Sequence, residues 1–198
     1  MQPVNPARPL LLASTSPYRR ALMARLGLVF TSASPRISEA PMTAEDPRAL
    51  AMRLAKAKAH ALDSDYPGYL VIGSDQVGLQ GDLLLGKPGD HASAVAQLMM
   101  ASGKWLEFYT AVCVHDSSHG ISRSAMIGTR VKLRRLQRQQ VERYISREQP
   151  LDCAGSFKCE SLGIALFERM ESEDPTALIG LPLMALTGLL AEFGIDVI

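Results

Sequence analysis

Arg19 and Lys58 are cations at positions where a folded chain rarely leaves a cation without an anionic partner. Arg19 falls in the first turn of a helix predicted for residues 17–26, where the helix dipole favours anions. It also shares the apolar face of that helix with Leu22 and Leu26. A phosphate bound by Arg19 and by the free N–H groups of the first turn would remove the conflict. The alternative is an arginine whose guanidinium extends past the core edge into water.

Lys58, like Arg19, lies on the apolar face of a helix, here one predicted for residues 46–65. The apolar face of this helix carries Leu50, Leu54 and Ala61. Lys58 has the helical spacing to join them. A lysine on a buried face is usually paired. Its partner is either a structural carboxylate of the protein or a ligand phosphate, and the spacing leaves both interpretations open.

Asp75 follows an apolar strand predicted for residues 69–74. In open α/β sheets, ligands bind beyond the carboxyl ends of strands, and a carboxylate there can hold a metal ion or polarise water. The alternative is an aspartate that only forms a turn. Glu39 and Lys87 carry no comparable signal when each is taken singly. The histidines do not suggest a metal site either, because His60 and His91 lie on predicted helices and His115 and His119 flank a predicted turn.

Alternating strands and helices must position these side chains. Strands are predicted at residues 9–14, 69–74, 105–115, 121–133 and 163–168, with a hairpin at 77–85. Helices are predicted at 17–26, 46–65, 90–101, 137–147 and 182–192, and residues 32–43 form a loop. Ser16 and Pro17 are a strong helix start. The class is α/β with a mixed twisted sheet and flanking helices, because hairpins interrupt the alternation. We expect one domain at residues 10–198 after a flexible extension at 1–9.

The composition excludes several classes of protein. The 198 residues are 47% hydrophobic and 21% charged with a net charge of +1, so there is no general basic field for nucleic-acid or membrane binding. Aromatic residues at 6% also disfavour an RNA-binding module. Three cysteines without CxxC spacing suit a reducing compartment. With neither a signal peptide nor an apolar run of about 18 residues, a cytoplasmic location is expected.

Six ordered motifs resemble those of the Maf family of nucleotide pyrophosphatases, over nearly the whole chain. Residues 11–28 (LLASTSPYRRALMARLGL) are similar to the family's Leu-Ala-Ser-x-Ser-Pro-Arg-Arg start. The others are RLAKAKA at 53–59, IGSDQV at 72–77, LGKP at 85–88 with ASGKWLEFYT at 101–110, DCAGSFKCE at 152–160 and IGLPLMAL at 179–186. Glu39 falls where the family has an acidic loop residue. Together these motifs are specific, although each alone is weak.

The resemblance implies an elongated α/β fold with a cleft between two lobes, a divalent cation (Mg²⁺ or Mn²⁺) and, in many members, a homodimer. Asp75 is then the catalytic carboxylate, with Glu39 assisting it at the metal. The phosphate channel is lined by Ser14, Arg19, Lys58 and Lys87. The partner is a small-molecule nucleotide, with no nucleic-acid polymer and no membrane. The expected reaction is attack of water on the α-phosphate with release of pyrophosphate.

Three departures from the commonest family pattern indicate the substrate. Tyr18, Gln76 and Glu160 stand where most members have Arg, Thr and Gln. This set resembles the subfamily that hydrolyses 7-methyl-GTP. The methylated guanine is cationic, so Tyr18 can stack on it with a cation–π gain of about 0.5–2 kcal/mol. Glu160 can accept the two donors of the Watson–Crick edge of guanine, and such paired polar contacts reject other bases.

Other interpretations of these residues stay open. Tyr18 can be a core residue at the start of a helix. The chain can act on dTTP, UTP or CTP by the same chemistry, in which case Glu160 would have little effect on substrate preference. A third interpretation is a non-catalytic nucleotide-binding regulator of cell division, although binding alone does not require a carboxylate at a metal site.

Overall fold

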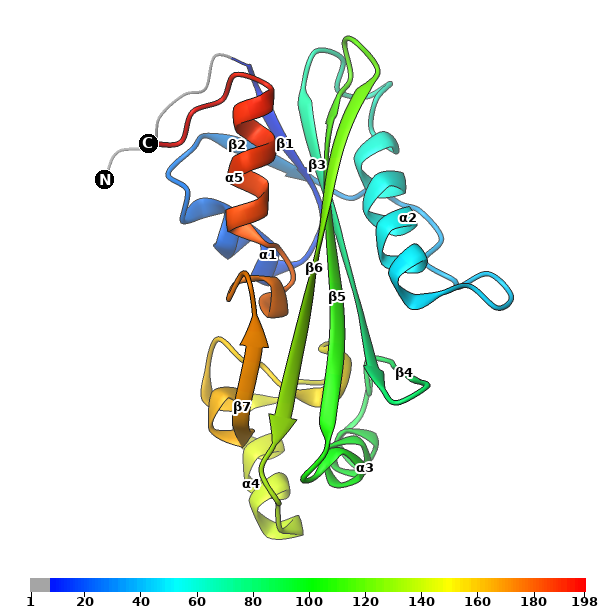
Figure 1. Cartoon of the computed structure of the whole chain (residues 1–198), viewed down its shortest axis with the longest axis vertical. Helices are drawn as coiled ribbons and strands as arrows, with labels where there is room; N and C mark the ends of the chain where they lie inside the picture. Colours follow the sequence, from blue (N-terminus) through cyan, green and yellow to red (C-terminus); the bar gives the residue numbers. More distant parts are fainter. Residues whose placement is uncertain (1–7) are drawn as a thin grey trace. The chain divides into compact units, whose positions relative to one another are not determined.

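The computed structural model describes residues 8–198 and contains a mixed seven-stranded sheet with five α-helices in that range (Figure 1). The strands are β1 (Leu10–Ala13), β2 (Phe30–Ala33), β3 (Leu70–Gln80), β4 (Leu83–Leu85), β5 (Trp105–Asp116), β6 (Ile121–Leu133) and β7 (Phe167–Ser172). The helices are α1 (Pro17–Ala24), α2 (Pro47–His60), α3 (His91–Ala101), α4 (Arg138–Glu148) and α5 (Leu183–Glu192). The sheet order is β2-β1-β3-β5-β6-β7, and β4 pairs with β3. The predicted class is therefore confirmed.

The chain divides into two compact units, each made of separate stretches of sequence. The first takes in the chain up to Gln76, together with Tyr109–Ile127 and Asp174–Ile198. The second comprises Val77–Phe108 and Gly128–Glu173. Residues 1–7 of the predicted flexible extension lie outside the described residues, and the single domain expected at 10–198 stays a prediction.

The core of the first unit lies on both faces of its parallel strands. β1 pairs in parallel with β2 and with β3, and all four residues of β1 are buried. Alternate residues of β1 face opposite sides: Leu10 and Leu12 join a cluster that contains Leu186 of α5, whereas Leu11 packs with Val71 on the other face. α1 and α5 cover one face of this part of the sheet and α2 covers the other (Figure 1). This explains why β1 is a continuous apolar run.

The helix starts that position Arg19 and Lys58 follow the predicted signals. Ser16 caps α1, accepting a hydrogen bond from the Arg19 amide at 3.4 Å, and proline is the first helical residue. Asp46 caps α2, and its carboxylate accepts from the amides of Arg48 and Ala49 at 2.9 and 3.1 Å. Capping of this kind typically stabilises a helix by about 1 kcal/mol.

Several elements differ from the prediction. β3 continues from Leu70 to Gln80, so Asp75 lies within the strand and not beyond its carboxyl end, and α2 ends at His60 instead of residue 65. β2 (Phe30–Ala33) overlaps the segment predicted as a loop. The sequence does not predict this strand because its residues are largely exposed and show no apolar alternation, and only pairing with β1 defines it. The strand predicted at 163–168 is wrong, since Leu162–Leu166 forms a 3₁₀ helix and β7 begins at Phe167. A Cβ at Gly163 would lie 2.2 Å from the Lys158 carbonyl oxygen, so the backbone turns tightly against the preceding loop there.

The core of the second unit contains three aromatic rings. Phe157 packs edge-on against Phe108 and against Phe167, with ring centroids 5.6 and 5.0 Å apart. Such edge-to-face pairs contribute about 0.5–1.5 kcal/mol beyond the area they bury. Asp90 caps α3 as predicted, accepting from the Ser93 amide at 2.9 Å. The unit thus has its own core and defined helix ends.

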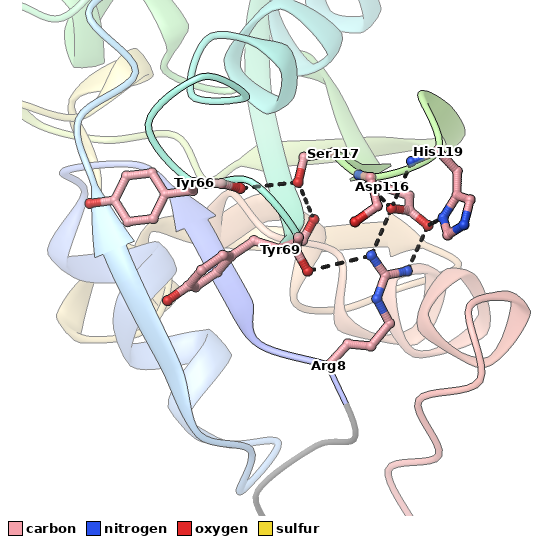
Figure 2. Close-up of polar contacts among 8 residues, drawn as sticks. Arg8, Tyr66, Tyr69, Asp116, Ser117 and His119 are labelled. Carbon is pink, nitrogen blue, oxygen red and sulfur yellow. Dashed lines mark hydrogen bonds and ion pairs between the residues drawn. The ribbon is translucent and has the colours of Figure 1, made fainter.

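An ion pair links Arg8, two residues before β1, to Asp116, the last residue of β5 (Figure 2). Both terminal nitrogens of Arg8 contact the Asp116 carboxylate at 2.6 Å, and His119 Nδ1 lies 2.8 Å from the same carboxylate. These hydrogen bonds, from Arg8 above all, hold the pKa of Asp116 well below its usual range. Ser117 donates to the carbonyl oxygens of Tyr66 and Tyr69 at 3.0 Å. Within residues 8–198, no helix has the length and apolar character needed to span a membrane.

Candidate functional site

The backbones of α2 and β3 are in direct contact at Gly73. A Cβ at this glycine would lie 2.2 Å from the carbonyl oxygen of Ala55 and 2.5 Å from the amide nitrogen of Ala59. Only glycine fits such an approach. Because side chains alternate along a strand, Asp75 projects from the same face as Gly73 and therefore toward α2. The close approach of the two backbones therefore sets how far the Asp75 side chain must reach to contact a side chain of α2.

Lys58 bridges Asp75 and Glu39. Its ammonium nitrogen lies 2.6 Å from Asp75 Oδ1 and 2.5 Å from Glu39 Oε1. Lys58 and Asp75 are only 4% and 6% exposed, whereas the Glu39 side chain is 55% exposed, so the cluster opens to solvent at Glu39. The partner of Lys58 in this structure is a pair of carboxylates, one of the two alternatives that the sequence leaves open. Its phosphate-binding role stays a prediction.

Arg19 is within electrostatic reach of the same carboxylates. Its Nε donates to the Gly180 carbonyl oxygen at 2.8 Å, which fixes the guanidinium against the segment before α5. Burial lowers the pKa of Arg19, and the charges of Asp75 and Glu39 raise it in opposition. The first unit thus gathers two cations and two carboxylates from α1, α2, β3 and the loop before α2.

Ser14 joins the end of β1 to the neighbouring elements. The residue is buried, and its hydroxyl oxygen accepts from the Ser16 amide at 3.2 Å. Its carbonyl oxygen accepts from the Ser32 hydroxyl at 2.8 Å. Tyr18 is partly exposed in the first turn of α1, the turn that also carries Arg19. Ser14 and Tyr18 therefore lie at the two ends of the short link between β1 and α1, and their assigned roles stay predictions.

Both neighbours of Asp75 on β3 hold the segment that precedes α5. The amide nitrogen of Gln76 donates to Thr110 Oγ1 and to the carbonyl oxygens of Ala177 and Leu178, at 3.0, 2.9 and 3.1 Å. The Ser74 hydroxyl donates to the Gly180 carbonyl oxygen at 2.9 Å. Since protein acceptors engage the Gln76 amide nitrogen, a substrate contact of Gln76 would have to use its amide oxygen. The sequence prediction missed the supporting residues Ser74, Thr110 and Gly180, which have no charge and no distinctive spacing.

Lys87 and Glu160 belong to the second unit. Lys87 is exposed in the loop between β4 and α3, and Glu160 is exposed in the loop after the short helix Ala154–Ser156. The thiol of Cys159 lies 3.7 Å from Glu160 Oε2. Burial, aided by the Glu160 charge, raises the pKa of Cys159 to about 12, so this thiol is protonated at neutral pH and is not a nucleophile. The predicted roles of Lys87 and Glu160 stay predictions.

The carboxylates at Lys58 have the chemistry of a site for a hard divalent cation. Mg²⁺ and Mn²⁺ prefer carboxylate oxygens and are commonly held by one or two carboxylates together with substrate phosphates. Asp75 and Glu39 approach one point closely enough to contact the same ammonium nitrogen. Two carboxylates fit such an ion. Its positive charge would take over part of the neutralisation of Asp75 and Glu39 that Lys58 provides.

Residues 9–193 match the family described as Maf-like protein. The chain belongs to the Maf family. It is 52% identical over 189 residues to the 7-methyl-GTP pyrophosphatase of Thiobacillus denitrificans, covering 96% of this chain and 94% of that one. It is 47% identical over 192 residues to the protein of the same name from Nitrosospira multiformis, covering 97% of each.

A solved structure gives a more distant likeness to this Maf-family chain. It is the nucleoside-triphosphatase (dITP/XTP pyrophosphatase) of Mycobacterium abscessus, at 18% identity and a TM-score of 0.44, covering 65% of this chain and 75% of that one. The full-length curated relatives are the informative matches.

Proposed function

We propose that this Maf-family chain is a nucleoside triphosphate pyrophosphatase that hydrolyses 7-methyl-GTP to 7-methyl-GMP and pyrophosphate in the cytoplasm. The observation that carries the proposal is the contact of Lys58 with both Asp75 and Glu39, with Arg19 in electrostatic reach. The cluster opens to solvent, so a ligand can reach it. Its cations suit a polyphosphate, and its carboxylates suit the metal ion that accompanies a polyphosphate. The names of the full-length relatives support the same activity.

Charge neutralisation is the main demand of this reaction, because the triphosphate is strongly anionic and the transition state needs little covalent help. Arg19, Lys58 and Lys87 neutralise phosphate oxygens, and Ser14 donates a hydrogen bond. Asp75 and Glu39 would hold Mg²⁺ or Mn²⁺, which when bound polarises a phosphoryl oxygen and favours departure of pyrophosphate.

Asp75 is the proposed general base. It takes a proton from the water that attacks the α-phosphorus. The new bond joins that water oxygen to phosphorus, and the bond from the α-phosphorus to the bridging oxygen breaks, so that pyrophosphate leaves with the electron pair. Asp75 is well placed for this because β3 holds it between Ser74 and Gln76, which are both bonded to the segment before α5. A rigidly held base loses less to misorientation.

Tyr18 and Glu160 are the proposed specificity residues. Tyr18 is partly exposed beside the Arg19 turn, where its ring can stack on a cationic base. Glu160 has an exposed carboxylate that can accept the two donors of the guanine Watson–Crick edge. Thymine and uracil present an acceptor on that edge, which a carboxylate does not satisfy.

Release of pyrophosphate from a panel of 7-methyl-GTP, GTP, dTTP, UTP and CTP, with and without Mg²⁺ or Mn²⁺, tests the proposal. We expect 7-methyl-GTP to have the highest kcat/KM and the activity to require the ion. Glu160→Gln should erode that preference by roughly 10-fold or more, since a paired polar contact is worth about 1.4 kcal/mol or more. The exposed Glu173→Gln is the matched control and should keep the wild-type preference.

Other outcomes identify the alternatives. Preference for dTTP, UTP or CTP, unmoved by Glu160→Gln, would give this chain the same chemistry with a different substrate. Tight nucleotide binding without pyrophosphate release would favour a non-catalytic regulator. Near-normal turnover by Asp75→Asn with substrate still bound would show that Asp75 is not the base.

A further inference from the structure

A second cluster of ligand-type side chains lies in the first unit. His60 is the last residue of α2, Asp63 follows it in the loop, and His115 lies near the end of β5. One potential ligand atom from each of the three falls within 4.8 Å of the other two. Asp63 Oδ2 is 3.0 Å from His115 Nε2 and 3.7 Å from His60 Nδ1. Two imidazole nitrogens therefore converge on one carboxylate oxygen.

Ser122 of β6 sets the orientation of both rings. Its hydroxyl oxygen lies 2.8 Å from His115 Nδ1 and 3.1 Å from His60 Nε2, the nitrogens on the far side of each ring from Asp63. A hydroxyl oxygen has two lone pairs and can accept an N–H from each imidazole. In that tautomer the nitrogens that face Asp63 carry the free lone pairs, so an ion bound there would replace the hydrogen bond that His115 Nε2–H can donate to Asp63 in its absence. Holding a ligating histidine by its other N–H is the usual outer-shell arrangement at metal sites.

The Asp63 carboxylate has a second oxygen that the protein does not satisfy. Asp63 Oδ1 is buried and has no hydrogen-bond partner among residues 8–198. An unsatisfied buried acceptor typically costs about 1–3 kcal/mol. His115 is also only 2% exposed, and its ring lies 3.8 Å from that of His60 between centroids.

We propose that His60, Asp63 and His115 bind a transition-metal dication of the Zn²⁺ class, through His60 Nδ1, His115 Nε2 and the Asp63 carboxylate. Two imidazoles and one carboxylate suit Zn²⁺, Co²⁺ or Ni²⁺ better than Mg²⁺, which prefers oxygen ligands alone. Bonds of about 2.0–2.2 Å to one ion require only small side-chain rotations from the present spacing. A solvent molecule completes a four-coordinate site.

This site differs in chemistry and in residues from the Lys58 cluster. The carboxylates Asp75 and Glu39 offer oxygen ligands only, whereas the histidine cluster offers two nitrogens. An ion there would link the end of α2 to β5 and, through Ser122, to β6. The expected effect is cross-linking of these elements, and hence a gain in stability that depends on the free metal concentration. The proposal is independent of which nucleotide the protein hydrolyses.

Zinc binding to the full-length protein tests the site directly. Zn²⁺ affinity is measured by chelator competition in millimolar Mg²⁺, which occupies oxygen-only sites, and Tm is recorded with and without Zn²⁺. We expect one tight site per chain and a rise in Tm. Asp63→Asn and His115→Gln should each weaken the affinity by more than about 100-fold, and Ser122→Ala by about 10-fold, the usual range for an outer-shell partner. His91→Gln, an exposed histidine of the second unit, is the matched control and should bind as the wild type does.

Two further measurements separate this site from other metal ligands. The visible spectrum of the Co²⁺ form should show four-coordinate nitrogen and oxygen ligation without thiolate charge transfer, because Cys113, Cys153 and Cys159 are not in the cluster. The double variant Asp75→Asn/Glu39→Gln should retain the zinc site. The proposal is overturned if the wild type gains no stability from Zn²⁺, if Asp63→Asn binds as tightly as the wild type, or if the spectrum is that of a thiolate site.

Discussion

The carbonyl oxygen of Ala55 lies 2.2 Å from the point at which Gly73 would carry a Cβ. The helix and the strand therefore meet backbone to backbone. Lys58 stands three residues along α2 from Ala55, and Asp75 stands two residues along β3 from Gly73, so both charged side chains project into the space beside this contact. Their 2.6 Å ion pair depends on an approach that no other residue type permits at position 73.

Gly73→Ala should be strongly destabilising. The added methyl group would meet backbone atoms, which cannot rotate away, so α2 must move off β3. We expect a loss of at least about 3 kcal/mol in the free energy of unfolding, beyond the usual 1–3 kcal/mol for an overpacked core. Urea unfolding measures this loss, and the residual folded protein should show reduced turnover because Lys58 retreats with α2.

Gly188→Ala is the control for that substitution. Gly188 is an exposed position of α5 where an added Cβ would meet nothing within 4 Å. Alanine in a helix interior is more stable than glycine by roughly 0.5–1 kcal/mol, so this variant should unfold at a higher urea concentration. Equal effects of the two alanines would contradict the steric argument.

Lys58→Met should destabilise the protein by leaving Asp75 buried without its cation. Removing one partner of a buried ion pair costs about 3–5 kcal/mol, and exposure of Glu39 to solvent places the expectation at the lower end. The double variant Lys58→Met/Asp75→Asn should recover much of that loss, because the uncompensated charge is gone. Lys56→Met, two residues away on the exposed side, should change stability by less than about 0.5 kcal/mol.

Gln76→Leu should loosen the segment that precedes α5. The substitution leaves the carbonyl oxygen of Leu178 without its donor, whereas that of Ala177 keeps the Thr110 hydroxyl and the Gly180 amide. The unsatisfied Leu178 oxygen is expected to cost about 1–3 kcal/mol. Turnover of the folded protein should fall with little change in KM if Gln76 acts by positioning Asp75. A large rise in KM with kcat unchanged would instead indicate a direct substrate contact. Gln139→Leu on the exposed side of α4 is the control.

Asp116→Asn should make the stability of the protein less sensitive to acid. The Asp116 pKa is lowered in the folded state from its ordinary value of 3.8, chiefly by hydrogen bonds from Arg8. A carboxyl with a depressed folded pKa contributes stability above its unfolded pKa and loses it as the pH falls toward the folded one. The Tm difference between wild type and variant should therefore be large at pH 7 and shrink toward pH 3. A constant difference, or an equal one for the exposed Asp65→Asn, would contradict this linkage.

The parts of the site that the sequence predicts are those with a local conflict. Lys58 on an apolar helix face and Asp75 at the end of an apolar run of sequence both conflict with local preference, and the structure brings them together, although β3 continues past Asp75 to Gln80. Glu39 has no such signal, because a loop carboxylate is ordinary; only the family resemblance points to it. The His60, Asp63 and His115 cluster also escapes sequence reasoning. Its members come from α2, the loop after it and β5, so their convergence depends on tertiary packing and not on local spacing.

The fold shows the same division between local and tertiary information. The helix starts at Ser16 and Asp46 are decided by adjacent residues, so they follow from the sequence. β2 is decided by pairing with β1, and its exposed residues give no periodic signal. The apolar run at 162–166 resembles a strand, and its 3₁₀ conformation depends on the contact of Gly163 with Lys158.

The first unit is made of three stretches of sequence, and the last of them is the end of the chain, which has a consequence for folding during synthesis. Arg19 and Ser74 bind the carbonyl oxygen of Gly180, and Gln76 binds those of Ala177 and Leu178, so the closing stretch Asp174–Ile198 supplies anchors for residues made much earlier. A ribosome must therefore release this stretch before the Lys58 cluster is fully supported. The nascent chain can assemble the second unit first, and a ribosome-bound chain stalled before Asp174 is expected to lack pyrophosphatase activity.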